Sequence, residues 1–305
     1  ASDWSSDVCS SDLTCASVGM VFWNQRMNLL TGESKFIDIL ERSLYNGALD
    51  GLRLTGDHFF YGNPLASRGQ HQRREWFGTA CCPANIARLV ASVGDYIYAK
   101  DANSLWVNLF IGSETSLPLN GRTVTIKQET NYPWEAGTRI LLDMEKPVAF
   151  TLYLRKPDWS GEAQGKTYQP VLGSIEKPVV LVNGSPVNYK EADGYLVIDR
   201  SWKKGDQVAY SFSMEPHLIR AHASVSQDEG RLAIQRGPLV YCVEGTDNDS
   251  RAWNILLPVG TSLSTATKSI NDEKVIEVKA VVPVITIDAQ GASLQTSKKE
   301  ITAIP

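Results

Sequence analysis

The spacing of apolar residues changes near residue 100, and this change limits the folds open to the chain. Before that point apolar residues recur every three or four positions, which predicts amphipathic helices over 16–30, 36–44 and 83–98. After it they alternate with polar residues, which predicts β-strands. The predicted strands cover 105–111, 123–127, 139–143, 149–155, 179–182, 195–199, 207–212, 232–234, 239–243 and 275–284.

Turn dipeptides separate the predicted strands. Asn-Gly at 120–121 and 183–184, and Asp-Gly at 193–194, suit two-residue hairpin turns, in which both residues have positive φ. Short strands at regular intervals, joined by such turns, indicate β-sandwiches. The predicted fold class is therefore α+β and multidomain, with a helical segment followed by two β-sandwich domains.

Charge and hydropathy exclude two classes of partner. The net charge of −4 leaves no basic stripe for a phosphate backbone, so we expect no nucleic-acid partner. No run of about 18 apolar residues occurs, so we expect no membrane span. No signal peptide is visible, and localisation stays open between bacterial cytoplasm and periplasm. Oligomeric state is not readable from the sequence.

The number and spacing of the five cysteines do not indicate a disulfide framework. Their number is odd, and Cys81 and Cys82 are adjacent, which strains a bond between them. Reduced thiols remain, with three open roles: buried apolar residues, metal ligands or a nucleophile.

Cys81 and Cys82 precede Pro83, which suits the first position of the predicted helix. The unpaired N–H groups of a helix N-terminus favour a thiolate, and a thiolate is a nucleophile or a zinc ligand. The alternative is a buried structural thiol. Cys15 begins another helical stretch, so three thiolates are available, although their spacing fits no zinc-finger pattern.

The segment 58–65 is aromatic and polar, and it includes Tyr61. Sugars bind by stacking on aromatic rings and by hydrogen bonding, so this loop either lines a saccharide pocket or packs as an ordinary loop. The tryptophans of the β region are expected in the sandwich cores; they are Trp106, Trp134, Trp159 and Trp202.

Several short segments carry a resemblance to a known family. From residue 14 to the C-terminus the chain resembles glycoside hydrolase family 127 and relatives such as family 146. The helical part contributes 14–17 (TCAS), 23–27 (WNQRM), 61–65 (YGNPL) and 76–88 (WFGTACCPANIAR), and the β part contributes 154–159 (LRKPDW) and 235–239 (QRGPL).

The resemblance implies a fold, a reaction and a metal. Residues 14–99 would be the end of an (α/α)6-barrel catalytic domain, 100–213 β-sandwich domain I and 214–305 β-sandwich domain II. The implied reaction is retaining hydrolysis of β-L-arabinofuranosides, with a plant-derived oligosaccharide or arabinoside as substrate. Cys81 would be the nucleophile, Cys15, Cys81 and Cys82 the Zn²⁺ ligands, and Tyr61 a substrate-binding residue.

The N-terminal residues depart from the family pattern. The family has a glutamate two residues before its first ligating cysteine, where this chain has Leu13. Its general-acid glutamate lies further upstream. Residues 7–13 resemble a translated sequencing adapter, so we expect 1–13, with Cys9, to be an artefact or a disordered tail. The chain is then an N-terminally truncated fragment, and we expect it to be inactive.

Two other functions remain open at this stage. One is a non-catalytic carbohydrate-binding β-sandwich protein. The other is a structural thiolate–zinc module without catalysis.

Overall fold

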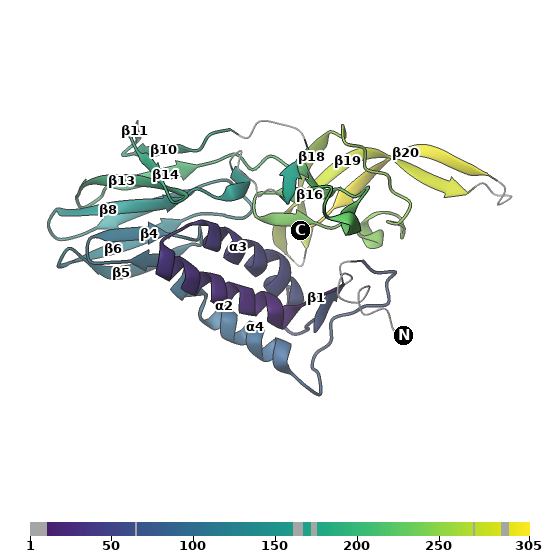
Figure 1. The fold of residues 1–305 in the computed structure, drawn as a ribbon, viewed down its shortest axis with the longest axis horizontal. Helices are drawn as coiled ribbons and strands as arrows, with labels where there is room; N and C mark the ends of the chain where they lie inside the picture. The colour runs from purple at the N-terminus through teal and green to yellow at the C-terminus, as the bar shows by residue number, and fades with distance from the viewer. Residues whose placement is uncertain (1–10, 65, 161–166, 172–175, 271, 288–292) are drawn as a thin grey trace. The chain divides into compact units, whose positions relative to one another are not determined.

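The computed structural model describes residues 11–64, 66–160, 167–171, 176–270, 272–287 and 293–305 (Figure 1). Residues 1–10, including Cys9, lie outside this part, so the expected tail is described only from position 11. The chain divides into two compact units. The first contains Ala1–Gly161 and Glu176–Ser213, and the second Glu162–Ile175 and Met214–Pro305.

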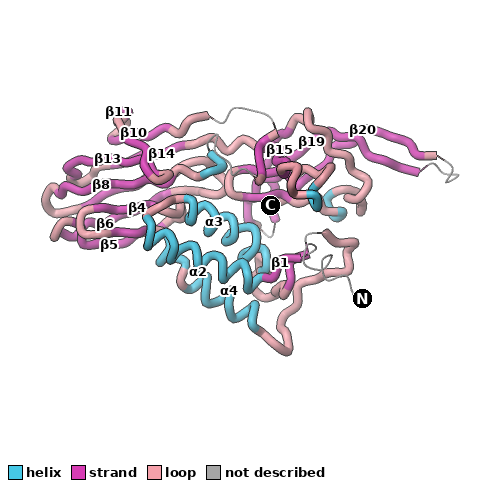
Figure 2. Tube along the Cα trace, in the orientation of Figure 1, coloured by secondary structure: helices cyan, strands magenta, loops and turns pink. Residues whose placement is uncertain are grey.

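The α-helices that the structure describes lie in the first unit, side by side (Figure 2). They are α2 (Thr14–Thr31), α3 (Lys35–Ser43) and α4 (Cys81–Ala91). Their apolar stripes bury Val21, Leu40 and Leu89 in one core. Gly32 follows the last residue of α2, and its φ of 73° suits a residue without a Cβ. Among the described residues, no helix is long and apolar enough to cross a bilayer.

Two larger sheets complete the first unit. Their strand orders are β11-β10-β14-β7-β6-β5 and β12-β13-β8-β4-β3, and all neighbours are antiparallel except β4 and β8. Alternate residues of β6, β8 and β13 are buried, so each sheet buries one face. The strands of this unit are β1 (Ser11–Leu13), β2 (Gly62–Pro64), β3 (Tyr98–Lys100), β4 (Ser104–Val107), β5 (Ser113–Leu119), β6 (Arg122–Glu129), β7 (Thr138–Asp143), β8 (Val148–Arg155), β10 (Val179–Val182), β11 (Ser185–Pro186), β12 (Lys190–Ala192), β13 (Tyr195–Trp202) and β14 (Gln207–Ser211).

The second unit is built from strands and short turns. One sheet has the order β17-β16-β15-β9 and the other the order β18-β19-β20. Its strands are β9 (Tyr168–Pro170), β15 (His217–Ala221), β16 (Ala233–Arg236), β17 (Leu239–Tyr241), β18 (Leu263–Ile270), β19 (Glu273–Ile287) and β20 (Leu294–Ala303).

The predicted hairpin turns are confirmed. Asn120 and Gly121 have φ values of 47° and 72°, and Asp193 and Gly194 have 52° and 79°. Each pair joins antiparallel neighbours, β5 to β6 and β12 to β13. Both residues of each turn are therefore in the left-handed region that these dipeptides tolerate.

The helix predicted over 83–98 was wrong at both ends. It begins at Cys81, so Pro83 is its third residue. The backbone N–H groups of a first helical turn have no partner within the helix, so a proline, which lacks this N–H, is tolerated there. It ends at Ala91, where the hydroxyl of Ser92 donates to the Leu89 carbonyl at 3.2 Å. A 3-10 turn over Val93–Tyr96 follows, and Tyr98 already pairs in β3.

The strand predicted over 105–111 was too long. Strand β4 ends at Val107, because the next carbonyl, that of Asn108, accepts a hydrogen bond from Arg155 Nε at 2.6 Å instead of from a strand. Arg155 is fully buried, and its other nitrogens reach two carboxylates of α3. Nη1 lies 2.7 Å from Asp38 Oδ1, and Nη2 pairs with Glu41 Oε1.

Glu41 extends this buried network. Tyr132 donates to its Oε1 at 2.7 Å, and the Trp159 indole donates to its Oε2 at 3.0 Å. Burial raises the pKa of Asp38 to about 7, against the opposing charge of Arg155. The buried guanidinium of Arg155 therefore holds helix α3 to strand β8, and it is hydrogen-bonded to Asp38, Glu41 and the Asn108 carbonyl.

Candidate functional site

Three cysteine sulfurs converge where two helices begin. Cys15 is the second residue of α2, and Cys81 and Cys82 are the first two residues of α4. Cys15 Sγ lies 3.5 Å from Cys81 Sγ and 3.1 Å from Cys82 Sγ, and the two adjacent sulfurs are 3.8 Å apart. We call these three atoms the sulfur cluster. The predicted ligands Cys15, Cys81 and Cys82 are therefore brought together in space.

The helix N-termini favour negative charge at the sulfur cluster. Neither α2 nor α4 has a side-chain cap, and both start at the same place. The first N–H groups of each helix, with the positive end of its dipole, therefore lie close to the sulfurs. This environment stabilises thiolates relative to thiols.

Cys81 and Cys82 differ in environment. The hydrogen bond with Tyr61, and next that with Cys15, lowers the pKa of Cys81, which is partly exposed. Burial raises the pKa of Cys82 to about 12, and its side chain is completely buried. Of the adjacent pair, Cys81 has the accessible and more acidic thiol.

Tyr61 lies directly over Cys81. Its hydroxyl oxygen is 3.1 Å from Cys81 Sγ, and this contact raises the pKa of Tyr61 to about 12. The phenol ring also meets Phe77 edge to face, with 5.6 Å between ring centroids. Tyr61 therefore stays protonated near neutral pH and can donate a hydrogen bond to a thiolate.

A frame of buried polar groups holds Tyr61 against α2. The Thr14 backbone N–H donates to the Tyr61 carbonyl at 3.2 Å, and its hydroxyl lies 3.3 Å from Asn63 Oδ1. Asn63 donates to the Gly47 carbonyl at 2.8 Å. A Cβ at Gly51 would lie 2.8 Å from the Thr14 side chain, so only glycine fits there. Asn63 lies in the loop 58–65 that the sequence singles out, but its supporting role and that of Gly51 depend on Thr14, far away in the chain, so no local pattern predicts them.

The sulfur cluster is a possible metal-binding group, and three thiols are a donor set that suits zinc. Tetrahedral zinc with Zn–S bonds of about 2.3 Å separates its sulfur ligands by about 3.8 Å. The sulfurs of Cys81 and Cys82 are at that distance, whereas Cys15 Sγ lies nearer to them, at 3.5 and 3.1 Å. Within the described part of the chain, these three cysteines form the group of potential ligands, and no histidine or carboxylate joins them within 4.8 Å. Leu13 precedes α2 and pairs through its backbone with Gly62. Its hydrocarbon side chain has no atom that could bind a metal.

The remaining candidates lie elsewhere. Cys242 is exposed and belongs to the second unit. Trp159 and Trp202 are buried, as expected for core residues. Trp106 and Trp134 are only half-buried, and Trp106 stacks on Tyr153 with 4.5 Å between centroids.

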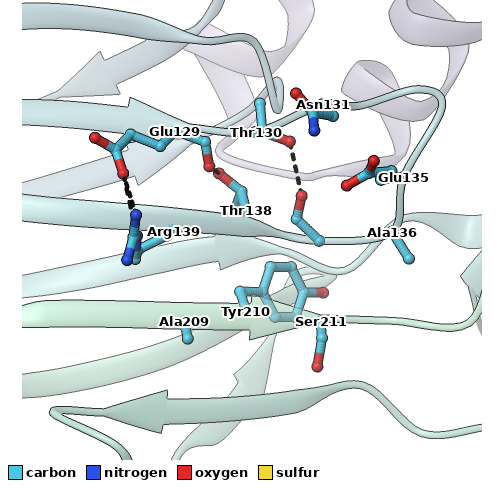
Figure 3. A pocket seen from close by; sticks show the side chains of 11 residues that line it. Glu129, Thr130, Asn131, Glu135, Ala136, Thr138, Arg139, Ala209, Tyr210 and Ser211 are labelled. Carbon is cyan, nitrogen blue, oxygen red and sulfur yellow. Dashed lines mark hydrogen bonds and ion pairs between the residues drawn. The ribbon is translucent and has the colours of Figure 1, made fainter. Parts of the chain in front are cut away.

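A separate hollow lies between β6, β7 and β14 (Figure 3). Its volume is about 450 Å³. Glu129 and Arg139 form an ion pair at 2.5 Å on one side, and Thr130 donates to the Gly137 carbonyl at 2.7 Å. Its aromatic lining residue is Tyr210, whose side chain is almost fully buried. The hollow therefore presents polar groups and backbone rather than an exposed ring.

Three sequence models of one family match the chain in succession. The model for the GH127 catalytic domain, described as β-L-arabinofuranosidase, matches residues 5–95. The GH127 middle domain matches residues 104–214, and the C-terminal domain of glycoside hydrolase family 127 matches residues 216–305.

Individual relatives agree with these matches. The chain is 33% identical over 270 residues to the non-reducing end β-L-arabinofuranosidase of Bifidobacterium longum subsp. longum, covering 82% of this chain and 38% of that protein. A solved GH127 β-arabinofuranosidase matches with a TM-score of 0.91 at 37% identity, covering 96% of this chain and 46% of its own. The GH127 β-L-arabinofuranosidase of Geobacillus stearothermophilus T6 has a TM-score of 0.86 at 36% identity, covering 96% and 47%. The chain thus spans less than half of each relative.

Proposed function

This chain belongs to glycoside hydrolase family 127, and on that premise we propose that its sulfur cluster is the cysteine-bearing part of an active site that hydrolyses β-L-arabinofuranosides. The observation that carries the proposal is the contact between the Tyr61 hydroxyl and Cys81 Sγ. It pairs an accessible thiol of lowered pKa with a polar group able to contact a sugar. Residues 14–99 are accordingly taken as the end of an (α/α)6 barrel, and the two sheet-rich parts as its β-sandwich domains.

In the proposed reaction Cys81 is the nucleophile. Its thiolate sulfur forms a bond to C1 of the arabinofuranosyl group while the bond from C1 to the leaving oxygen breaks, and that oxygen takes a proton from a general acid. Water then attacks C1 and gives a proton to the conjugate base of that acid, while the sulfur–carbon bond breaks and the thiolate and the acid are restored. Two displacements at one carbon retain its configuration.

Cys15, Cys81 and Cys82 would hold Zn²⁺ in this site. Zinc bound to sulfur keeps a cysteine deprotonated at neutral pH. The helix N-termini and Tyr61 act in the same direction through the chain's own groups. Tyr61 would donate to the thiolate before attack and contact the sugar once it is bound.

We expect this chain alone to hydrolyse ordinary alkyl arabinofuranosides very slowly. Among the described residues no carboxylate lies with the sulfur cluster to protonate the leaving oxygen. Loss of a general acid typically reduces a rate by about 100- to 10,000-fold. A nitrophenyl leaving group departs without protonation, so its release depends less on the acid.

The test is therefore nitrophenol release from p-nitrophenyl β-L-arabinofuranoside, with mass spectrometry of the quenched chain. We expect a Cys81-linked arabinosyl adduct and slow release, both abolished by Cys81→Ser. Cys242→Ser is the matched control, because it removes an exposed thiol of the second unit. Nitrophenol release that survives Cys81→Ser would refute the nucleophile.

The alternative, a carbohydrate-binding β-sandwich protein, would use the hollow between β6, β7 and β14. Its lining lacks an exposed aromatic ring for stacking, which favours the hydrolase. Arabinoside binding that persists in Cys81→Ser but is lost in Arg139→Met would favour the binding protein instead.

A further inference from the structure

Asn85 contacts the sulfur cluster at Cys15, whereas Tyr61 contacts it at Cys81. It lies one helical turn after Cys81 on α4, and its side-chain Nδ2 is 3.1 Å from Cys15 Sγ. Residues four apart share a helix face, so Asn85 and Cys81 both point toward the start of α2. Asn85 is partly buried between the two helices.

Arg88 sets the orientation of the Asn85 amide. Its Nη2 lies 2.9 Å from Asn85 Oδ1. A guanidinium only donates hydrogen bonds, and within an amide only the oxygen accepts them. The amide oxygen is therefore committed to Arg88, and its NH₂ group faces the sulfur of Cys15 as a donor.

Arg88 is itself held by α2. Its guanidinium carbon lies 4.7 Å from the centre of the Phe22 ring. Phe22 follows Cys15 by seven positions and Arg88 follows Cys81 by seven, so each pair lies two turns apart along its helix. Helices α2 and α4 therefore touch at two levels: at Cys15 and Cys81, and two turns further on at Phe22 and Arg88.

We propose that Asn85 is a positioning residue that fixes the Cys15 sulfur in place as a metal ligand, with Arg88 fixing its amide. The amide NH₂ donates to Cys15 Sγ at 3.1 Å, and Arg88 holds the amide oxygen on the other side, so the sulfur is oriented before a metal binds. Hydrogen bonds to a metal ligand orient it and tune its affinity for the metal. The inference deepens the proposed function and rests on its zinc site.

The test is a titration of the whole metal-free chain with Co²⁺, followed by the sulfur-to-cobalt charge-transfer absorbance. Cys15→Ser defines the part of that absorbance that depends on Cys15. Asn85→Leu, which is similar in size but lacks the donor, is expected to weaken Co²⁺ binding by about 10- to 100-fold. Circular dichroism of each variant checks that it folds.

Arg88 and Arg26 provide the matched comparison. Arg88→Met frees the amide and is expected to give a smaller loss, with no further loss when combined with Asn85→Leu, because Arg88 acts through Asn85. Arg26 is also an exposed arginine, and it donates to the Phe22 carbonyl at 3.0 Å. Arg26→Met should leave Co²⁺ binding unchanged.

The outcomes separate the two proposals. Cys15-dependent absorbance in the wild type that is equally strong in Asn85→Leu would overturn the positioning role and leave the zinc site standing. Additive losses in the double variant would overturn the role of Arg88 through Asn85. If the wild-type chain gives no Cys15-dependent absorbance, the zinc site of the proposed function fails, and the role of Asn85 fails with it.

Discussion

Cys81 and Cys82 are neighbours in the chain, but the structure shifts the pKa values of their thiols in opposite directions. Successive residues of an α-helix point about 100° apart, so Cys82 turns into the core while Cys81 stays at the surface beside Tyr61. Burial raises the pKa of Cys82, and the hydrogen bond with Tyr61 lowers that of Cys81. The difference arises from what each side chain touches and not from residue type.

Replacing Tyr61 tests this difference at a single hydroxyl. In the metal-free chain, Tyr61→Phe removes the hydrogen bond that favours the Cys81 thiolate. The pKa of Cys81 is lowered in the folded chain, so the midpoint for alkylation of Cys81 should move to higher pH in the variant. Site-resolved mass spectrometry after pulses of iodoacetamide measures it. Tyr98→Phe is the control, since the Tyr98 hydroxyl bonds to Ser113; an unchanged midpoint in Tyr61→Phe would contradict the assignment.

At the scale of elements, α2 and α3 are positioned by buried polar groups as well as by apolar packing. Thr14 and Asn63 tie the start of α2 to the loop that carries Tyr61. Arg155 ties α3 to strand β8 through Asp38 and Glu41. Removing one member of such a buried set leaves the others unpaired, which costs more than the set contributes when complete.

Arg155→Met should destabilise the first unit by about 3–5 kcal/mol, because it leaves the buried carboxylates of Asp38 and Glu41 without their positively charged partner. The loss should grow as pH rises, since burial raises the pKa of Asp38 to about 7 and Arg155, whose charge opposes that rise, is absent from the variant. Urea unfolding at pH 5 and pH 8 measures both effects. Arg139→Met is the control: Arg139 pairs with Glu129 at the surface, and its loss should cost less than about 1 kcal/mol. Equal losses in the two variants would contradict this account.

Gly51→Ala should also destabilise the start of α2. The new methyl would meet the Thr14 side chain at 2.8 Å, and overpacking of this kind costs about 1–3 kcal/mol. Gly19→Ala makes the same chemical change within α2, where nothing lies within 4 Å, and should stabilise by about 0.5–1 kcal/mol. Thermal unfolding followed by circular dichroism distinguishes the two signs. Stabilisation by Gly51→Ala would show that Thr14 is not packed as described.

At the scale of the whole molecule, the sulfur cluster belongs entirely to the first unit, and the second unit has its own sheets. A ligand that binds only one folded unit stabilises that unit in proportion to its excess over the dissociation constant. Metal binding should therefore affect the two units differently.

Zinc should raise the unfolding temperature of the first unit alone. At about 1,000 times the dissociation constant the gain is about 4 kcal/mol. Differential scanning calorimetry with zinc and with a chelator measures the transitions. Cys15→Ser should remove most of the shift, whereas Cys242→Ser should keep it. A zinc-induced shift that Cys15→Ser leaves intact would place the metal elsewhere.

The sequence by itself determined the type of most elements and the hairpin turns, and it singled out Cys15, Cys81 and Cys82 as candidate site residues. Helical and alternating periodicity act over a few residues, and Asn-Gly and Asp-Gly favour positive φ without help from the rest of the chain. The ends of α4 and β4 could not be predicted this way, because Ser92 and Arg155 redirect the backbone through side-chain hydrogen bonds.

The family resemblance already grouped Cys15, Cys81, Cys82 and Tyr61 as site residues, but only the tertiary structure shows how closely they meet and adds Asn85 to them. Cys15 reaches Cys81 across 66 positions, and Asn85 reaches Cys15 across 70. No local pattern encodes such separations, because they depend on how α2 and α4 pack side by side. That packing turns Cys81 toward Tyr61 and Cys82 into the core, which adjacent identical residues in a sequence cannot reveal.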